Sequence, residues 1–170
     1  MLGRLFGRAK DETQQAGGGA ELARAVRAEL PDADETTARI ITAVTGLLGC
    51  IAYSDKDYSE VEEARVMREL SRIHGLSAKG AHAICAVLRA HIVEIAAAET
   101  ASYGRELVEL ADRDLRLELL DVLVDLAAAD DDISVRETNM LRRATQALAL
   151  SQDDYNASQS RHRQKLSVLK

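Results

Sequence analysis

The sequence has few residues that interrupt regular structure and few aromatic residues. Among 170 residues there are one proline, no tryptophan, one phenylalanine and four tyrosines. A core with so few aromatic rings must be built mainly from Leu, Ile, Val and Ala, and this mixture favours helix over strand. The composition therefore predicts an all-α protein.

Cysteine is also scarce, and acidic residues outnumber basic ones by 28 to 22. The two cysteines, Cys50 and Cys85, lie in apolar stretches without a CxxC partner, which indicates small buried residues in place of a disulfide or a thiol site. A formal net charge of −6 argues against nucleic-acid binding, which requires a basic face. The four histidines have no zinc-ligand spacing, and neither a phosphate-binding glycine pattern nor a nucleophile motif occurs. We therefore expect no enzymatic activity.

Long apolar stretches are absent as well. No stretch approaches the roughly 18 consecutive apolar residues of a membrane span. The start, residues 1–10, is basic but lacks the apolar region and cleavage site of a signal peptide. We expect a cytoplasmic protein with a flexible N-terminal segment, residues 1–19, and a single helical domain, residues 20–170. A weak contact of residues 1–10 with a membrane surface is the alternative to a solvated terminus.

Hydrophobic periodicity predicts several helices along this domain. A short helix over 20–30 stops at Pro31, and Asp32 or Asp34 can cap the next helix, which begins near residue 35. Further helices are predicted over 59–74, 77–98, 103–111, from 114 onwards, and weakly over 151–170. Gly75 suits the left-handed position after a helix, and Ser77 can cap the helix that follows.

Part of this pattern occurs twice, at an offset of 75 residues. The apolar positions of the first long helix recur in the second: Ile40, Val44, Leu47, Leu48 and Ile51 become Leu115, Leu119, Val122, Leu123 and Leu126. The acidic stretches that follow, "SDKDYSEVE" and "ADDDISVRE", keep the same offset. We expect two helix–acidic loop–helix repeats, about 35–77 and 110–151, packed as hairpins about a pseudo-twofold axis.

Helix capping explains part of each acidic stretch. Ser59 with Glu62, and Ser134 with Glu137, have the S-x-x-E spacing of a capping box, in which each residue's side chain bonds the other's backbone N–H. Tyr58 and Ile133 occupy the preceding apolar position of a hydrophobic staple. Capping needs no ligand.

Capping does not explain the aspartates that come before the serines. Asp55 and Asp57 in the first copy match Asp130 and Asp132 in the second. Turn formation accounts for one aspartate of each pair, whereas hard cations such as Ca²⁺ and Mg²⁺ favour clustered carboxylates. The stretches are not EF-hand loops, because Glu60 or Val135 stands where the loop needs glycine. If the two loops meet across the axis, they can pool their carboxylates around a divalent metal ion whose identity the sequence does not give.

The doubled acidic loop resembles the TerB-like family, the tellurite resistance protein B group. Its hallmark is similar to A-D-G-x-h-x-x-x-E, where h is apolar, and Lys56 and Asp131 replace the glycine here. The "LFGR" start, the "HGLS" helix break and the two-copy layout extend the resemblance over most of the chain.

The resemblance implies a compact bundle of about seven helices with an acidic surface that holds a metal ion, in proteins of the stress response. The implied ligands are Asp55, Asp57, Glu62, Asp130, Asp132 and Glu137. Loss of the glycine questions whether the tight loop can form, because glycine takes positive φ most readily.

A second function is open at this point. TerB-like domains precede the J domain in DjlA-like membrane co-chaperones, which implies a metal-independent interaction or scaffold module that binds a protein partner. The net charge and the weakly amphipathic final segment support this hypothesis. The J-domain His-Pro-Asp triplet is absent from the sequence.

Overall fold

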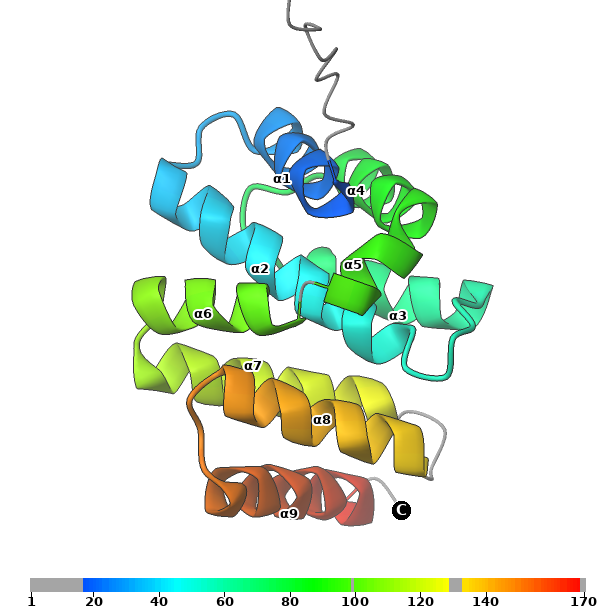
Figure 1. Ribbon diagram of the computed structural model, residues 1–170, viewed down its shortest axis with the longest axis vertical. Helices are drawn as coiled ribbons and strands as arrows, with labels where there is room; N and C mark the ends of the chain where they lie inside the picture. The colour runs from blue at the N-terminus through cyan, green and yellow to red at the C-terminus, as the bar shows by residue number, and fades with distance from the viewer. Residues whose placement is uncertain (1–16, 99, 129–132, 169–170) are drawn as a thin grey trace, which may run out of the picture.

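The fold is that of a helical bundle (Figure 1). The computed structural model describes residues 17–98, 100–128 and 133–168. Within these ranges every regular element is a helix, which confirms the predicted all-α class. The helices are α1 (Gly18–Glu29), α2 (Glu35–Ala52), α3 (Glu60–Leu70), α4 (Ala78–Ala90), α5 (Ile92–Ala98), α6 (Thr100–Leu110), α7 (Arg113–Ala127), α8 (Val135–Ala147) and α9 (Gln152–Val168).

Side chains that accept backbone hydrogen bonds begin several of these helices. Asp34 Oδ1 accepts from the Thr37 N–H at 2.7 Å, so Asp34 and not Asp32 caps α2. Asp112 caps α7 in the same way, and Ser77 Oγ caps α4 by accepting from the Gly80 N–H at 3.0 Å. The N-terminal helix begins at Gly18, two residues before its predicted start, because the Gly18 N–H donates to Glu94 Oε2 of α5 at 2.8 Å.

The helix predicted over 77–98 is interrupted at His91, which accounts for part of the excess over about seven helices in the described chain. On the N-terminal side of this break α4 packs on α1 and α3, and beyond it α5 packs on α2. The bend brings Leu88 and Ile92 against Gly49 of α2, where a Cβ would lie 2.7 Å from the nearest Leu88 methyl. Periodicity alone cannot reveal the break, because both halves keep an apolar face.

The two repeats form the two halves of the molecule, with α2 and α7 in contact between them (Figure 1). Contacts across the halves are reciprocal: α2 packs on α8, and α7 packs on α3. Equivalent side chains are buried in both copies, among them Leu48 with Leu123 and Val66 with Leu141. These duplicated apolar side chains belong to one hydrophobic core. Burial of one such side chain contributes roughly 1.5–3 kcal/mol to stability.

Helix α6 joins the repeats and lies in close contact with both α2 and α8. The Tyr103 ring covers Gly46 of α2, where an added Cβ would lie 2.2 Å from the ring. Gly104 lies against Ala147 of α8, and its Cβ would lie 2.4 Å from the alanine methyl. Small residues therefore bring α6 close enough to bury Leu107.

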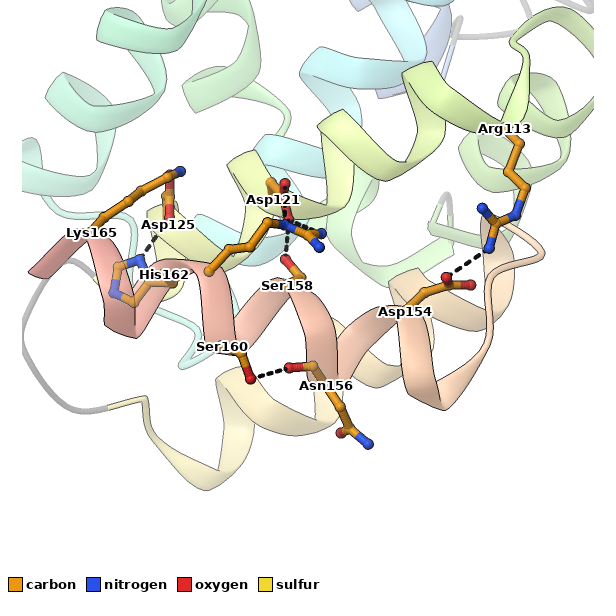
Figure 2. A network of polar contacts seen from close by, with 10 residues as sticks. Arg113, Asp121, Asp125, Asp154, Asn156, Ser158, Ser160, His162 and Lys165 are labelled. Carbon is orange, nitrogen blue, oxygen red and sulfur yellow. Dashed lines mark hydrogen bonds and ion pairs between the residues drawn. The ribbon is translucent and has the colours of Figure 1, made fainter.

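Helix α9 makes a series of polar contacts with α7, and they come from a segment whose apolar periodicity in the sequence is weak (Figure 2). Asp121 accepts hydrogen bonds from Ser158 Oγ at 2.5 Å and Arg161 Nη2 at 2.7 Å. Asp125 lies 2.6 Å from His162 Nδ1 and 2.9 Å from Lys165 Nζ. Among the described side chains of α9, Tyr155 is buried, with 2% exposed.

One described helix, α2, is long and apolar enough to cross a membrane by length and composition. Within the bundle 56% of it is buried, as in the core helix of a globular protein. Core helices and signal sequences have this length and hydropathy too, so α2 is weak evidence for a membrane span.

Candidate functional site: the paired acidic loops and a neighbouring groove

The first acidic loop is a tight turn between α2 and α3. Asp55 Oδ1 accepts a hydrogen bond from the Asp57 N–H at 2.9 Å, which is the turn role foreseen for one aspartate of the pair. Lys56 between them has φ +69°, the left-handed region that glycine adopts most readily. The tight turn therefore forms with lysine at the position where the hallmark has glycine, and Lys56 bears a strain of about 1 kcal/mol.

Both predicted capping boxes are present. The Glu62 N–H donates to Ser59 Oγ at 3.2 Å, and the Ser59 N–H donates to Glu62 Oε2 at 2.8 Å. Ser134 and Glu137 repeat this exchange at 3.1 and 2.7 Å. One oxygen of each glutamate is thus used to begin a helix.

The two copies meet in space as far as the structure describes them. Arg136, at the start of α8, donates from Nη1 to the backbone oxygen of Asp55 at 3.2 Å. A cavity of about 10 Å³ lies between the repeats, and we call it the joint cavity. Its walls are three pairs of residues 75 positions apart and one arginine: Ile51 and Leu126, Ala52 and Ala127, Glu62 and Glu137, and Arg65.

Arg65 breaks the symmetry of the joint cavity. Its counterpart at the 75-residue offset is Met140, so only the first repeat brings a cation to the cavity. The guanidinium lines the same small space as Glu62 and Glu137, and it is partly buried there. Arg65 therefore brings a positive charge to the cavity that Glu62 and Glu137 also line.

The electrostatics of Glu62 reflect this crowded position. Burial raises the pKa of the Glu62 carboxyl, and the nearby Asp55 and Asp57 carboxylates raise it further, while the hydrogen bonds from Ser59 act in the opposite direction. Three of the six predicted ligands are therefore close enough to repel one another.

A divalent cation such as Ca²⁺ or Mg²⁺ needs several oxygen ligands around one point. In the part of the chain that the structure describes, no group of three His, Cys, Asp or Glu side chains is arranged to hold a metal ion. Asp130 and Asp132 lie outside the described residues. Of the described candidate ligands, Asp55, Glu62 and Glu137 each accept a backbone N–H with one carboxylate oxygen.

The other predicted positions behave as structural residues. Cys50 and Cys85 are buried and form no disulfide, and burial raises the pKa of the Cys85 thiol to about 12. Arg89 was not foreseen: its guanidinium lies 5.1 Å from the centre of the Tyr58 ring, bonds the Tyr58 backbone oxygen at 3.2 Å and pairs with Glu63. A comparison of the two repeats position by position would have pointed to Arg65 and Arg136, since both stand opposite apolar residues.

A larger concavity, the α3–α7 groove, lies between those two helices with α2 as its floor. Its volume is about 230 Å³. Most of its lining is aliphatic and comes from Val44, Leu48, Leu70, Ile73, Leu115, Leu119 and Val122, with Glu69, Arg72 and Glu118 also contributing. Leu115 is 38% exposed, and Val44, Ile73 and Val122 are partly buried. In the sequence, Val44, Leu115 and Val122 belong to the same duplicated apolar pattern as the buried residues.

Comparison with known proteins gives one match. A family model described as tellurite resistance protein TerB matches residues 41–160. The matched range includes both acidic loops and the helices that line the α3–α7 groove. No curated protein and no solved structure matches the chain.

Proposed function

The chain belongs to the TerB family, and from this membership we propose that it is a non-catalytic domain of the tellurite-resistance type that binds a protein partner through the α3–α7 groove. The observation that supports this proposal is the aliphatic lining of the groove, which consists of seven side chains from α2, from the end of α3 and the turn after it, and from α7. Concave apolar surfaces of this kind are the usual sites where folded domains capture ligands. Family membership supports a role in stress resistance, and two cysteines that form no disulfide support a reducing, cytoplasmic setting.

In this proposal the acidic loops join the two repeats without a metal. Glu62 and Glu137 begin helices, Asp55 closes a turn, and Arg65 and Arg136 supply the positive charge between the copies. The loops then hold α3 and α7 in register, which fixes the width of the groove. The partner-binding surface and the family hallmark thus belong to one unit.

A divalent cation at the acidic loops is the second candidate. The observation that favours it is the raised pKa of Glu62, with Asp55 and Asp57 among its causes, because grouped carboxylates attract a cation. In this case Asp55, Asp57 and Glu62 would act with Asp130, Asp132 and Glu137, as the family resemblance implies. Thermal melting separates the two candidates. If the acidic loops hold a divalent cation, a chelator should lower the melting temperature of protein loaded with that cation, and otherwise it should not.

Site-specific crosslinking tests the groove. We expect a photo-reactive residue at position 115 to give one defined adduct in cells, and the adduct to disappear when Val122→Asp is added. The matched control is position 93, because Val93 is 61% exposed on α5 and lies outside the groove. An adduct pattern that is the same from positions 115 and 93, or no adduct from position 115, would contradict the proposal.

Because Val122 is partly buried, its substitution can affect folding. Leu115→Ser, paired with a photo-reactive residue at position 73, provides a second variant at an exposed site. Circular dichroism must show the same helix content for each variant as for the parent chain.

A further inference from the structure

We infer that the ligand of the α3–α7 groove is an amphipathic α-helix of about three turns with a basic flank, docked in the manner of α6. This inference rests on the proposed function and adds the chemistry of the partner. Its evidence comes from the internal repeat, since one copy of the groove is already filled by a helix of the chain itself.

The repeat relates the groove to the seat of α6. Shifted by 75 positions, the α7 wall becomes the α2 stripe Ile40, Ala43, Val44 and Leu47. The wall formed just after α3, Arg72 and Ile73, becomes Ala147 at the end of α8 and Leu148 directly after it. Helix α6 packs on α2 and α8, and its Gly104 lies directly against Ala147. Among the described helices, only α2 packs against both α3 and α7. The groove is thus the open counterpart of an occupied site.

The way α6 is held shows what such a site accepts. Its buried face consists of Thr100, Tyr103, Gly104 and Leu107, at the i, i+3, i+4, i+7 spacing of one helix face. Its flank is acidic, and Glu106 and Glu109 both pair with Arg39 of α2. The seat of α6 therefore combines an apolar floor with a charge of opposite sign at one edge.

The edge of the open groove carries the opposite charge. Asp114 is the counterpart of Arg39, and Glu118, one turn further along α7, lines the groove. Both are exposed, and neither has an ion-pair partner among the described residues. The third carboxylate, Glu69, is already paired with Arg72 at 2.7 Å. A helix seated here would therefore place lysine or arginine where α6 has Glu106 and Glu109.

The two sites differ in one respect that shifts the expected position of the ligand. Gly46, which receives the Tyr103 ring, corresponds to Asp121, and Asp121 is covered by Ser158 and Arg161 of α9. A docked helix must therefore lie nearer to α3 than α6 lies to α8. Its anchors would be aliphatic side chains facing Ile73, Leu115 and Val122.

Peptides made from α6 itself provide the probe. Both have the sequence of residues 100–111 and are locked as helices by a lactam bridge between positions 101 and 105, which are exposed in α6. One keeps the native acids, and the other carries Glu106→Lys and Glu109→Lys. Binding to the full ¹⁵N-labelled chain is followed by chemical-shift changes, which detect millimolar affinities.

We expect the basic peptide to bind about three- to tenfold more tightly than the native one at low salt, with the difference reduced at 0.5 M salt. The shifted resonances should come from α3 and α7. Leu115→Ser should weaken both peptides, and Glu118→Lys should remove the preference for the basic one. The matched control is Asp32→Lys, an exposed acid in the turn before α2, which should leave the preference unchanged.

Equal affinities for the two peptides, or shifts outside α3 and α7, would overturn the inference. So would self-association of the chain through the groove, seen as a dimer that Leu115→Ser dissociates, because the ligand would then be a second copy. If neither peptide binds but the crosslink from position 115 is still lost in Val122→Asp, the helical ligand is wrong and the protein-binding groove stands. If both peptides bind and no crosslink forms in cells, the proposed function fails at the level of its partner.

Discussion

The Arg136 guanidinium at the start of α8 donates a hydrogen bond to the backbone carbonyl of Asp55, 81 residues earlier, at 3.2 Å. This contact ties the second repeat to the tight turn of the first. Because Arg136 is exposed, we expect Arg136→Ala to lower the free energy of unfolding by only about 0.5 kcal/mol. The local effect should be larger: amide hydrogen exchange at Lys56 and Asp57 should accelerate, because the turn loses its support from α8.

The control for this exchange experiment is Arg143→Ala, an exposed arginine on the same helix. It should leave the exchange of the turn unchanged. Equal exchange rates in Arg136→Ala and the parent chain would show that the turn does not depend on the second repeat.

The joint cavity gives a sharper prediction. Arg65→Met makes the two repeats alike at this position and leaves Glu62 and Glu137 around the cavity without the guanidinium. We expect the free energy of unfolding to fall by roughly 1–3 kcal/mol, because two partly buried carboxylates lose a nearby positive charge. Urea denaturation measures this change.

The same variant separates the roles of arginine and metal. If Arg65 takes the place of a cation, the melting temperature of the parent chain should not respond to millimolar Ca²⁺ or Mg²⁺, whereas that of Arg65→Met should rise. A parent chain whose melting temperature rises with metal as much as that of the variant would contradict the metal-independent joint.

The repeat and the caps could be predicted from the sequence because both depend on local chemistry. A duplicated apolar stripe marks the core faces of α2 and α7, and the S-x-x-E spacing by itself defines a capping box. The division of the predicted 77–98 helix could not be foreseen, because both halves keep an apolar face and the contacts that differ between them are with other helices. The α3–α7 groove could not be predicted either. Leu115 and Val122 have the same periodicity as buried residues, and they line a groove because no described helix covers them between α3 and α7. The structure places Asp55 and Asp57 near Glu62, and Glu62 and Glu137 line the same cavity. The acidic motif does not indicate that Arg65 lines this cavity too.

Lys56 offers a test of backbone strain in the loop. Its φ of +69° costs about 1 kcal/mol for a residue with a Cβ, whereas glycine adopts this conformation freely but loses more chain entropy on folding. We expect Lys56→Gly to raise the free energy of unfolding by about 0.5 kcal/mol, measured by urea denaturation. Asp57→Gly, at the next position but without positive φ, should lower it.

The close approach of α6 to α8 can be tested at Gly104. An added Cβ would lie 2.4 Å from the Ala147 methyl and 2.7 Å from its backbone carbonyl, so Gly104→Ala must push the helices apart. We expect a loss of about 2–3 kcal/mol in the free energy of unfolding. Ala147→Gly should restore part of it by removing the methyl, although the backbone contact remains. The control is Gly17→Ala, since nothing lies within 4 Å of a Cβ at Gly17.

Acid should release α9 from α7 before the rest of the bundle unfolds. Burial tends to raise the pKa of Asp121, but the bonds from Arg161 and Ser158 outweigh it and hold the pKa below its ordinary value of 3.8. A carboxyl whose folded pKa is depressed stabilises the folded state above its unfolded pKa, and this contribution is lost as pH falls through the folded pKa. The stability of the parent chain should therefore fall below about pH 4, with Asp121→Asn about 1 kcal/mol less stable at pH 7 and less sensitive to acid. The fluorescence of Tyr155, a buried side chain of α9, reports the release, and a pH profile of Asp121→Asn that matches the parent chain would show that another group controls it.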